Sequence, residues 1–283
     1  MNSNKNPLVL VTGANGGIGR EICRQLLQSG CKVIMSCRPF GTGPEFYKSL
    51  VREYGVGRVT LLTMDFSSFD SVKQAAGFLL KTEKHIDILI NNAGMLGWEP
   101  QVSAEGYEMH NMVNCLGPML FTWLVKPLLS EGSRVINTVS LALRYGTIPV
   151  FFPYPGDTFN RFGCYSCSKL ALTLISLRLA ALWKEEGIYV NMADPGIVNT
   201  PIITLHKWVD PLTDVLFRPF IRQTPRGAST AVFLAKDPSV EGITGKLFKD
   251  NKSLQLPARI INHPDAGRVW SFFITLCTYG NQQ

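Results

Sequence analysis

The sequence has few charged residues, and these are dispersed. Asp, Glu, Lys and Arg make up 17% of the 283 residues, and the net charge is +7. There is no run of five or more Lys and Arg residues, so the basic footprint of a nucleic-acid-binding protein is missing. Hydrophobic residues reach 46%, which is enough for a sizeable buried core and excludes a disordered chain. The composition favours a globular protein and gives no indication of a nucleic-acid partner.

Long apolar stretches are also missing. Before the first polar loop there is only the short apolar run Leu8–Val11, so a signal peptide is not expected. No segment reaches the roughly 18 uncharged apolar residues of a membrane span. The nearest candidate, Ala171–Trp183, is interrupted by Arg178. We therefore predict a cytoplasmic, soluble protein with no transmembrane span, with peripheral membrane contact as an open alternative.

The seven cysteines do not form a metal or disulfide pattern. Cys164 and Cys167 have the C-x-x-C spacing of redox dithiols and metal sites. A zinc site needs more ligands, and none of the four histidines is suitably spaced from these thiols. No metal is predicted. The two cysteines are interpreted as small packing residues in a reducing compartment, with a regulatory role as the alternative.

What the sequence does contain is a regular alternation of strand and helix patterns. Apolar, β-rich runs predict strands at Leu8–Thr12, Lys32–Ser36, Val59–Thr63, Ile86–Ile90, Arg134–Thr138 and Ile188–Ala193. Between them, helices are predicted at Ile18–Ser29, Phe46–Tyr54, Ser71–Glu83, Gly106–Leu129 and Cys164–Glu186. This alternation predicts an α/β fold: a single doubly wound, Rossmann-type parallel sheet with helices on both faces. No repeat or linker divides the chain, so one domain over residues 1–283 is predicted.

Two long irregular stretches interrupt this alternation. Leu143–Phe162 is rich in Pro, Gly and aromatic residues, and Thr200–Thr224 contains three prolines. Both follow predicted strands and so emerge at the carboxyl edge of the sheet, where α/β proteins bind ligands. We predict that residues 200–224 form a substrate loop. The aromatic residues of the first stretch either line an apolar pocket or anchor the loop. A closing helix near 264–279 is apolar on most sides and is predicted to pack on its own domain or on a partner subunit.

A glycine-rich turn follows the first strand. The segment Thr12–Gly19 reads TGANGGIG and leads directly into a predicted helix. Gly13 permits a tight turn, Gly16 or Gly17 lets the backbone approach a pyrophosphate, and Gly19 allows the helix to pack closely on the strand. The helix N-terminus adds positive potential. The pattern favours a dinucleotide-binding turn over a purely structural one.

A phenol and an ammonium group share one face of a later helix. Tyr165 and Lys169 are four residues apart, which is one helical turn. A neighbouring ammonium favours the phenolate, so the pKa of Tyr165 is expected to fall from its usual value of about 10. Such a tyrosine can donate a proton when a carbonyl is reduced and accept one when an alcohol is oxidised.

Several motifs in chain order resemble those of the short-chain dehydrogenase/reductase family. They are TGANGGIG, Asn91-Asn92-Ala93-Gly94, Asn114-x-x-Gly117, Ser140 after the fifth strand, Tyr165-x-x-x-Lys169 and Pro195-Gly196-x-Val198-x-Thr200. The resemblance implies a catalytic set of Asn114, Ser140, Tyr165 and Lys169. It implies that Ser140 polarises the substrate oxygen and that Asn114 holds a water linked to Lys169. It also implies that Lys169 binds the nicotinamide ribose.

The resemblance and the glycine turn together indicate a nicotinamide dinucleotide site. The predicted cofactor-binding residues are Gly13, Asn15, Gly16, Gly17, Ile18, Gly19, Arg38, Asp65, Phe66, Asn92, Ala93, Gly94, Tyr165, Lys169, Pro195, Gly196, Val198 and Thr200. An NAD site would place an acid at the end of the second strand, yet none appears there before Glu45. Arg38 can instead pair with a 2′-phosphate. NADP(H) is therefore favoured over NAD(H).

The long interval from Ser140 to Tyr165 resembles the retinol dehydrogenase branch of the family, which includes protochlorophyllide reductases and WW-domain oxidoreductases. The sequence SLA at Ser140–Ala142 and the tail Arg268–Ser271 resemble the same branch. We expect an NADP(H)-dependent enzyme that interconverts a carbonyl and an alcohol on an apolar molecule such as a lipid aldehyde, retinoid or steroid. An N-terminal anchor like that of the membrane-bound retinol enzymes is not expected.

Two other functions and two assembly states stay open. The chain could be a dinucleotide-binding sensing or interaction protein with little turnover, or a reductase of C=C bonds. The resemblance suggests a homodimer through the paired helices predicted at Gly106–Leu129 and Cys164–Glu186, with a monomer as the alternative.

Overall fold

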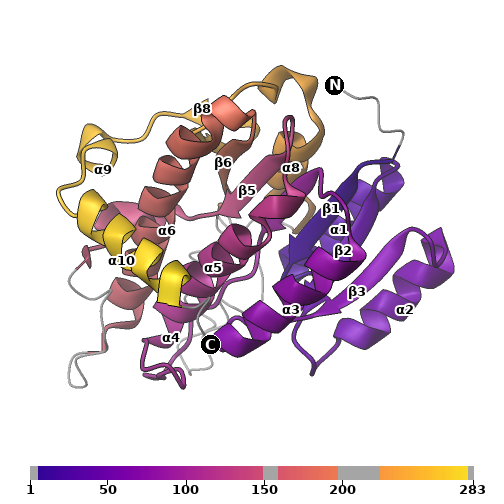
Figure 1. Ribbon diagram of the computed structural model, residues 1–283, viewed down its shortest axis with the longest axis horizontal. Coiled ribbons are helices and arrows are strands. Elements are labelled where there is room, and N and C mark those ends of the chain that lie inside the picture. Colours follow the sequence, from indigo (N-terminus) through magenta and orange to yellow (C-terminus); the bar gives the residue numbers. More distant parts are fainter. Residues whose placement is uncertain (1–5, 149–158, 197–223, 280–283) are drawn as a thin grey trace, which may run out of the picture.

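The computed structural model describes residues 6–148, 159–196 and 224–279. At its centre lies an eight-stranded sheet in the order β3-β2-β1-β4-β5-β6-β7-β8 (Figure 1). The strands are β1 Leu8–Thr12, β2 Lys32–Cys37, β3 Val59–Thr63, β4 Ile88–Asn91, β5 Arg134–Thr138, β6 Tyr189–Asp194, β7 Leu247–Lys249 and β8 Lys252–Leu254. Every neighbouring pair is parallel except β7–β8, which is antiparallel. The predicted α/β fold is confirmed.

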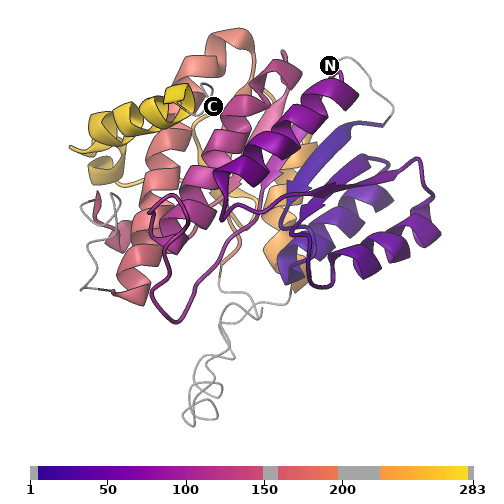
Figure 2. The same cartoon turned by 60° about the horizontal axis from the view of Figure 1, so that its bottom comes forward.

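The sheet separates two hydrophobic cores because side chains alternate along each strand. In β1, Val9 and Val11 belong to one core and Leu10 to the other, and all three are fully buried. Helices cover both faces of the sheet (Figures 1 and 2). One face carries α1 Gly17–Gln28, α2 Gly43–Tyr54 and α8 Thr224–Lys236. The other carries α3 Phe69–Thr82, α5 Gly117–Leu124, α6 Arg161–Trp183 and α10 Ala266–Tyr279.

Short helical turns complete the described structure. They are α4 Met109–Asn111, the π-helical turn η1 Met112–Leu116, the 3-10 turns η2 Lys126–Leu128, η3 Leu141–Tyr145, η5 Lys184–Glu186 and η7 Pro238–Val240, and α9 Ala258–Ile261. The helix predicted over Gly106–Leu129 is confirmed in type but not in its bounds, because α4, η1 and α5 run without a gap from Met109 to Leu124 and only η2 follows. A π-helical turn inside a helix often marks a functional site, and this one contains Asn114.

Helix α8 and the β7–β8 hairpin are among the elements that were not predicted. Helix α8 buries Gly227, Ala228 and Ala231, small residues that give little hydrophobic periodicity but let the helix lie close to its neighbours. The β7–β8 hairpin consists of three-residue strands. Its turn residues, Asp250 and Asn251, both have positive φ, of 51° and 61°. That is the left-handed conformation of the two-residue turns that match the twist of a hairpin.

Helix α10 lies where a closing helix was predicted and packs across α5 and α6 (Figures 1 and 2). The Trp123 ring of α5 is 6.4 Å from that of Trp270 and 5.9 Å from that of Phe273. Trp123 also stacks on Trp183 of α6 at 6.3 Å. The aromatic surface around Trp123 and Trp183 is thus covered by the chain's own closing helix.

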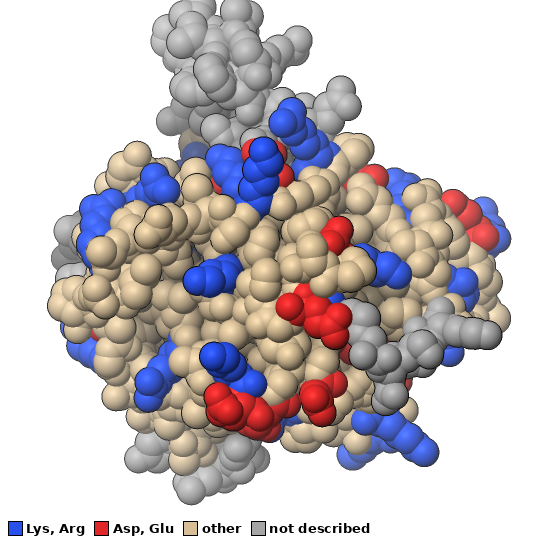
Figure 3. Space-filling model, turned by 90° about the horizontal axis from the view of Figure 1, so that it is seen from above, with Lys and Arg blue, Asp and Glu red and all other residues tan. Residues whose placement is uncertain are grey.

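Charged side chains are dispersed over the described surface, as they are along the sequence, and one described helix is long and apolar. On the face shown in Figure 3, basic and acidic side chains are interspersed. Among the described residues, one helical segment, Arg161–Glu186, is long and apolar enough to cross a membrane. Within its most apolar window, 78% is buried inside the protein. This segment therefore has the burial of a core helix.

Candidate active site

The glycine turn brings β1, α1 and the chain after β4 into close contact. Gly13 has φ of +62°, and a Cβ at this position would lie 2.7 Å from the Cα of Ala93. A Cβ on Gly19 would lie 2.1 Å from the carbonyl oxygen of Gly13. Neither position can accept a side chain without moving the backbone.

The first turn of α1 suits a diphosphate. Its N-cap is Gly16, no side chain caps the helix, and its first turn contains no acidic residue. Backbone N–H groups and the positive end of the helix dipole are therefore offered to an anion. Arg20 adds a cation beside the turn, where its Nε donates to the Asn15 carbonyl at 2.9 Å and its Nη2 donates to Thr42 Oγ1 at 2.6 Å. These residues fit a dinucleotide.

The Asn91–Gly94 motif braces the carboxyl edge of the sheet. The Thr12 hydroxyl accepts hydrogen bonds from the backbone N–H groups of Asn92 and Ala93, both at 3.1 Å. The side chain of Asn92 donates to the Thr12 carbonyl at 3.0 Å. Asn91 Nδ2 donates to Asn137 Oδ1 of β5 at 2.8 Å. The motif thus ties β1, β4 and β5 together at the edge where α1 begins.

Tyr165 and Ser140 meet at the same edge. Ser140 follows β5 and caps η3, with its Oγ accepting from the N–H of Ala142 at 3.2 Å. Tyr165 lies in the first turns of α6, which begins after the N-cap Asn160. Ser140 lowers the pKa of Tyr165 as a hydrogen-bonding neighbour, so the two side chains lie close together. The structure therefore brings together the two hydroxyl groups that the sequence placed in the catalytic set.

The pKa of Tyr165 differs from the sequence expectation. Burial of the phenol raises its pKa above 10.0, the hydrogen bond with Ser140 partly lowers it, and the charge of Asp194 raises it further. The ammonium of Lys169 lies 5.8 Å from the tyrosine ring centroid. In this structure desolvation of the phenolate outweighs any attraction to that ammonium, so the phenol stays protonated at neutral pH.

Lys169 is buried one turn further along α6. Its side chain is 4% exposed, and its Nζ donates to the Thr138 carbonyl at 2.9 Å. Burial lowers its pKa from 10.5 to about 8, whereas Cys115 and Asp194 act in the opposite direction. The pKa of Lys169 is therefore closer to neutral pH than that of an exposed lysine, so its ammonium loses a proton more readily.

Asn114 connects the catalytic helix to the chain after β4. Its Oδ1 accepts from the Met95 N–H at 2.7 Å, and its Nδ2 donates to the Met95 carbonyl and to Ser168 Oγ, both at 3.0 Å. A Cβ on Gly94 would lie 3.3 Å from Asn114 Oδ1 and 3.6 Å from Lys169 Nζ. Asn114 and Lys169 therefore flank the same glycine, although the asparagine amide is engaged by Met95 and Ser168.

The other predicted cofactor residues lie at the carboxyl ends of their strands. Arg38 is exposed after β2, with its guanidinium 4.8 Å from the Phe40 ring centroid. Asp65 follows β3 and accepts from the N–H and hydroxyl of Ser67 at 2.9 and 2.8 Å. Phe66 is 5% exposed and its ring packs 6.2 Å from Phe121, so its side chain belongs to the core.

The Pro-Gly motif is only partly described. Pro195 and Gly196 follow β6, and the N–H of Gly196 donates to Asp194 Oδ1 at 3.0 Å. Val198 and Thr200 lie outside the described residues, as do most of the predicted substrate loop and Phe151, Phe152 and Tyr154.

Sequence reasoning missed Asp194 and Ser168. Asp194 is 2% exposed, its Oδ2 lies 3.7 Å from Lys249 Nζ, and its charge acts on both Tyr165 and Lys169. An acid at the end of a buried strand, directly before Pro-Gly, was the available signal. Ser168 had no comparable signal, because its bond to Asn114 depends on how α6 meets the π-helical turn.

The C-x-x-C cysteines are buried beside this site. Cys164 and Cys167 are at most 1% exposed and neither forms a disulfide. Burial raises the pKa of both thiols, which therefore stay protonated and unreactive. In the described parts of the chain, no three His, Cys, Asp or Glu residues are grouped so that they could hold a metal ion.

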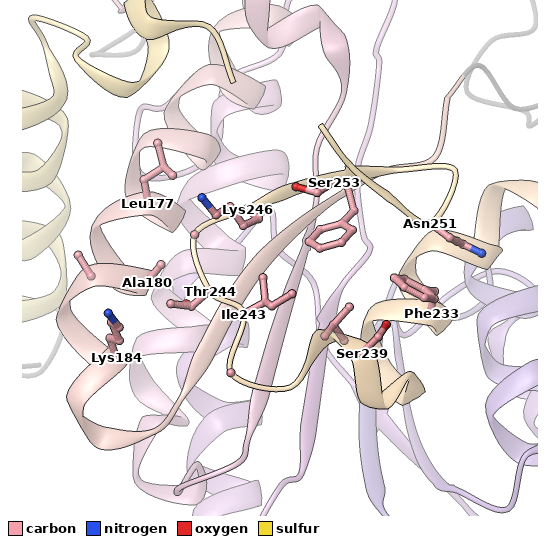
Figure 4. A pocket seen from close by; sticks show the side chains of 15 residues that line it. Leu177, Ala180, Lys184, Phe233, Ser239, Ile243, Thr244, Lys246, Asn251 and Ser253 are labelled. Carbon is pink, nitrogen blue, oxygen red and sulfur yellow. The ribbon is translucent and has the colours of Figure 1, made fainter. Parts of the chain in front are cut away.

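A cavity of about 720 Å³ lies elsewhere, between α6, α8 and β7 (Figure 4). It is lined by residues of the second half of α6 such as Leu177, and by Phe233, Ile243 and Phe248, with Lys184 and Lys246 beside them. None of its lining residues is in the predicted catalytic or cofactor sets. This cavity is therefore separate from the cluster around Tyr165.

Comparison with known proteins agrees with this geometry. The family model described as short chain dehydrogenase matches residues 7–207. Human retinol dehydrogenase 14 is 34% identical over 280 residues, covering 93% of this chain and 83% of that protein. Mouse polyprenol dehydrogenase is 33% identical over 274 residues, covering 93% and 82%.

A solved structure has the same fold. It is that of a short chain dehydrogenase from Burkholderia cenocepacia in complex with NADP, which matches with a TM-score of 0.69 and 20% identity over 87% of this chain and 98% of that one. The predicted family and the resemblance to retinol dehydrogenases are confirmed. The chain belongs to the short-chain dehydrogenase family and is an oxidoreductase that acts on CH–OH groups.

Proposed function

We propose that the protein is an NADP(H)-dependent oxidoreductase that interconverts a carbonyl and an alcohol on an apolar small molecule, with Tyr165 as general acid and base. The observation that carries this proposal is the proximity of the Ser140 and Tyr165 side chains at the carboxyl edge of the sheet, where Ser140 acts on the pKa of the phenol. Lys169 follows one turn later on the same helix. The uncapped, acid-free start of α1 lies at the same edge.

In this mechanism the cofactor, when bound, supplies or accepts the hydride. Ser140 holds the substrate oxygen by a hydrogen bond. Tyr165 gives that oxygen a proton as a carbonyl becomes an alcohol, and takes it back in the reverse direction. Because its raised pKa keeps the phenol protonated at neutral pH, the residue is ready to act as the acid of carbonyl reduction. Lys169, held by the Thr138 carbonyl, would resupply a proton to the phenol, and a water at Asn114 would link Lys169 to solvent.

An apolar substrate is favoured by the surface beside this edge. Trp98 after β4, Tyr145 in η3 and Phe162 in α6 are 41%, 71% and 53% exposed. The rings of Tyr145 and Phe162 lie 5.9 Å apart. Exposed aromatic groups of this size beside a site favour an apolar ligand. The relatives named as retinol and polyprenol dehydrogenases suggest an isoprenoid or other lipid alcohol or aldehyde.

A panel of alcohols and aldehydes tests the proposal, assayed with NADP(H) and NAD(H) in parallel. We expect NADPH oxidation with apolar aldehydes and slower oxidation with NADH. Cofactor binding without turnover on any member of the panel would instead favour a sensing protein. Product analysis separates carbonyl reduction from C=C reduction, since only the first yields an alcohol from a saturated aldehyde.

NADP(H) preference is assigned to Arg38. The sequence after β2 has no acid before Glu45, and Arg38 is exposed there. We expect Arg38→Glu to lower the ratio of kcat/KM with NADPH to that with NADH by roughly 10- to 100-fold, the worth of a charge-assisted hydrogen bond. The matched control is Arg52→Glu on α2, which makes the same charge change at another exposed arginine. An unchanged ratio in Arg38→Glu would remove the argument for NADP(H).

A further inference from the structure

The loop of residues 95–98 begins at the reacting groups. It follows Gly94, the residue that lies against Asn114 Oδ1 and Lys169 Nζ. The first residue of the loop, Met95, forms two hydrogen bonds with the Asn114 side chain, one through its backbone N–H and one through its carbonyl. Its last residue, Trp98, is a large aromatic that is 41% exposed. The loop thus runs from the catalytic cluster to the surface.

A buried carboxylate and imidazole hold the middle of this loop. Glu108 is 2% exposed and His110 is 1% exposed, and Glu108 Oε1 lies 2.6 Å from His110 Nδ1. The second carboxylate oxygen accepts from the N–H of Asn111 at 3.1 Å. On the other side of the ring, Nε2 accepts from the N–H of Gly97 at 3.0 Å. Because Nε2 accepts, the neutral ring carries its proton on Nδ1 and donates it to Glu108.

Arg161 binds the same loop from α6. Its Nε donates to the Gly97 carbonyl at 3.0 Å, and its Nη2 donates to the Leu96 carbonyl at 3.1 Å. Its guanidinium carbon lies 3.5 Å from the centroid of the Trp98 ring, a cation–π contact. Arg161 is one helical turn before Tyr165, so both lie on the same face of α6. The loop and the catalytic tyrosine are therefore positioned by one helix.

We propose that Glu108, His110 and Arg161 are positioning residues that fix the 95–98 loop as one wall of the substrate site, with Trp98 contacting the apolar part of an elongated alcohol or aldehyde. The proposal rests on the proposed function. The buried pair is fully hydrogen-bonded and costly to assemble, and what it holds in place is the backbone N–H of Gly97. The groups act through the loop, so they determine KM for long substrates more than kcat.

The test compares His110→Leu, which removes the acceptor for Gly97, with His110→Gln, whose side-chain oxygen can still accept. Nonanal and propanal serve as long and short aldehydes with NADPH. For His110→Leu we expect KM for nonanal to rise about 3- to 10-fold, the worth of one net hydrogen bond. The KM values for propanal and NADPH should stay unchanged, and His110→Gln should restore most of the loss.

Hydrogen exchange of the NADPH-bound enzyme gives a second readout that does not use turnover. The peptide covering residues 94–99 should exchange faster in His110→Leu than in wild type or His110→Gln. Arg161→Gln should give the same rise in KM for nonanal with unchanged KM for propanal. Because Arg161 is only half-buried, this variant tests the proposal even if the His110 variants fail to fold. If His110 had only a structural role, His110→Leu would lower Tm but would change KM for nonanal and propanal to the same extent.

The matched control is His85→Leu. His85 and Asp87 have the same spacing and pair through Nε2 and Oδ1 at 3.2 Å, but they precede β4 and are partly exposed. This variant should change neither exchange at residues 94–99 nor KM for nonanal. Wild type that does not reduce nonanal would contradict the proposed function. Wild type that does, with equal KM in His110→Leu and Arg161→Gln, would overturn this inference alone.

Discussion

Tyr165→Phe is expected to lower kcat by about 100- to 10,000-fold, the usual contribution of a positioned acid or base. The variant removes one oxygen, the atom that exchanges a proton with the substrate. The dinucleotide turn, α1 and the hydrogen bond from Lys169 to the Thr138 carbonyl are unaffected. The Kd for NADPH should therefore stay close to that of wild type, and the measurement is turnover and NADPH titration on the same preparation.

The control for this prediction is Tyr47→Phe on α2, which removes a hydroxyl far from the catalytic set. It should leave kcat and NADPH affinity unchanged. Tyr165→Phe with undiminished turnover would refute the role assigned to the phenol. Loss of NADPH binding in that variant would show that the tyrosine acts on the cofactor, not on the proton.

Lys169→Met is expected to abolish most turnover and yet stabilise the cofactor-free protein at pH 7. Burial lowers the Lys169 pKa from 10.5 to about 8 in the folded state. Between these values the unfolded chain binds more protons than the folded one, so wild-type stability rises as pH increases through this window. At pH 7 the lysine is charged in both states and its burial cost is fully present. Replacing the charged lysine with methionine should raise the free energy of unfolding by about 1–2 kcal/mol, since the removed burial cost is larger than the lost hydrogen bond to Thr138.

Urea unfolding at pH 7 and pH 10 measures this difference. The advantage of Lys169→Met should shrink at pH 10, where Lys169 in the folded wild type is mostly neutral. Lys184→Met serves as the control because Lys184 is exposed at the end of the same helical segment. It should change stability by less than about 0.5 kcal/mol. A variant at Lys169 that is less stable than wild type at pH 7 would contradict the burial argument.

The strands that the sequence predicted best are short, buried runs between polar turns. β1, β3 and β5 have the predicted bounds. β1 and β5 are buried on both faces, whereas β3, at the edge of the sheet, has two exposed threonines. The helical stretch within Gly106–Leu129 was predicted, but its π-helical turn at Met112–Leu116, where Asn114 pairs with Met95, has no signal in the hydrophobic pattern. Helix α8 was not predicted because it packs through small residues, which give little hydrophobic periodicity.

The sequence predicted those parts of the candidate site whose positions follow from the ends of the strands. Ser140 follows β5 and Tyr165 lies in the first turns of the next long helix, so parallel topology brings them together. The pKa of Tyr165 was not predictable, because spacing shows the neighbouring ammonium but not the burial that outweighs it. The contact from His110 to Gly97 was also hidden, since it depends on the path of a loop with no regular pattern.

The most direct test of the proton-transfer assignment is a crystal structure of the protein with NADPH and an alcohol product bound. Our proposal predicts that the alcohol oxygen accepts or donates hydrogen bonds at both Ser140 Oγ and the Tyr165 hydroxyl, with the dinucleotide phosphates at the first turn of α1. An alcohol oxygen bound away from both hydroxyl groups, in a complex that is competent for turnover, would contradict it.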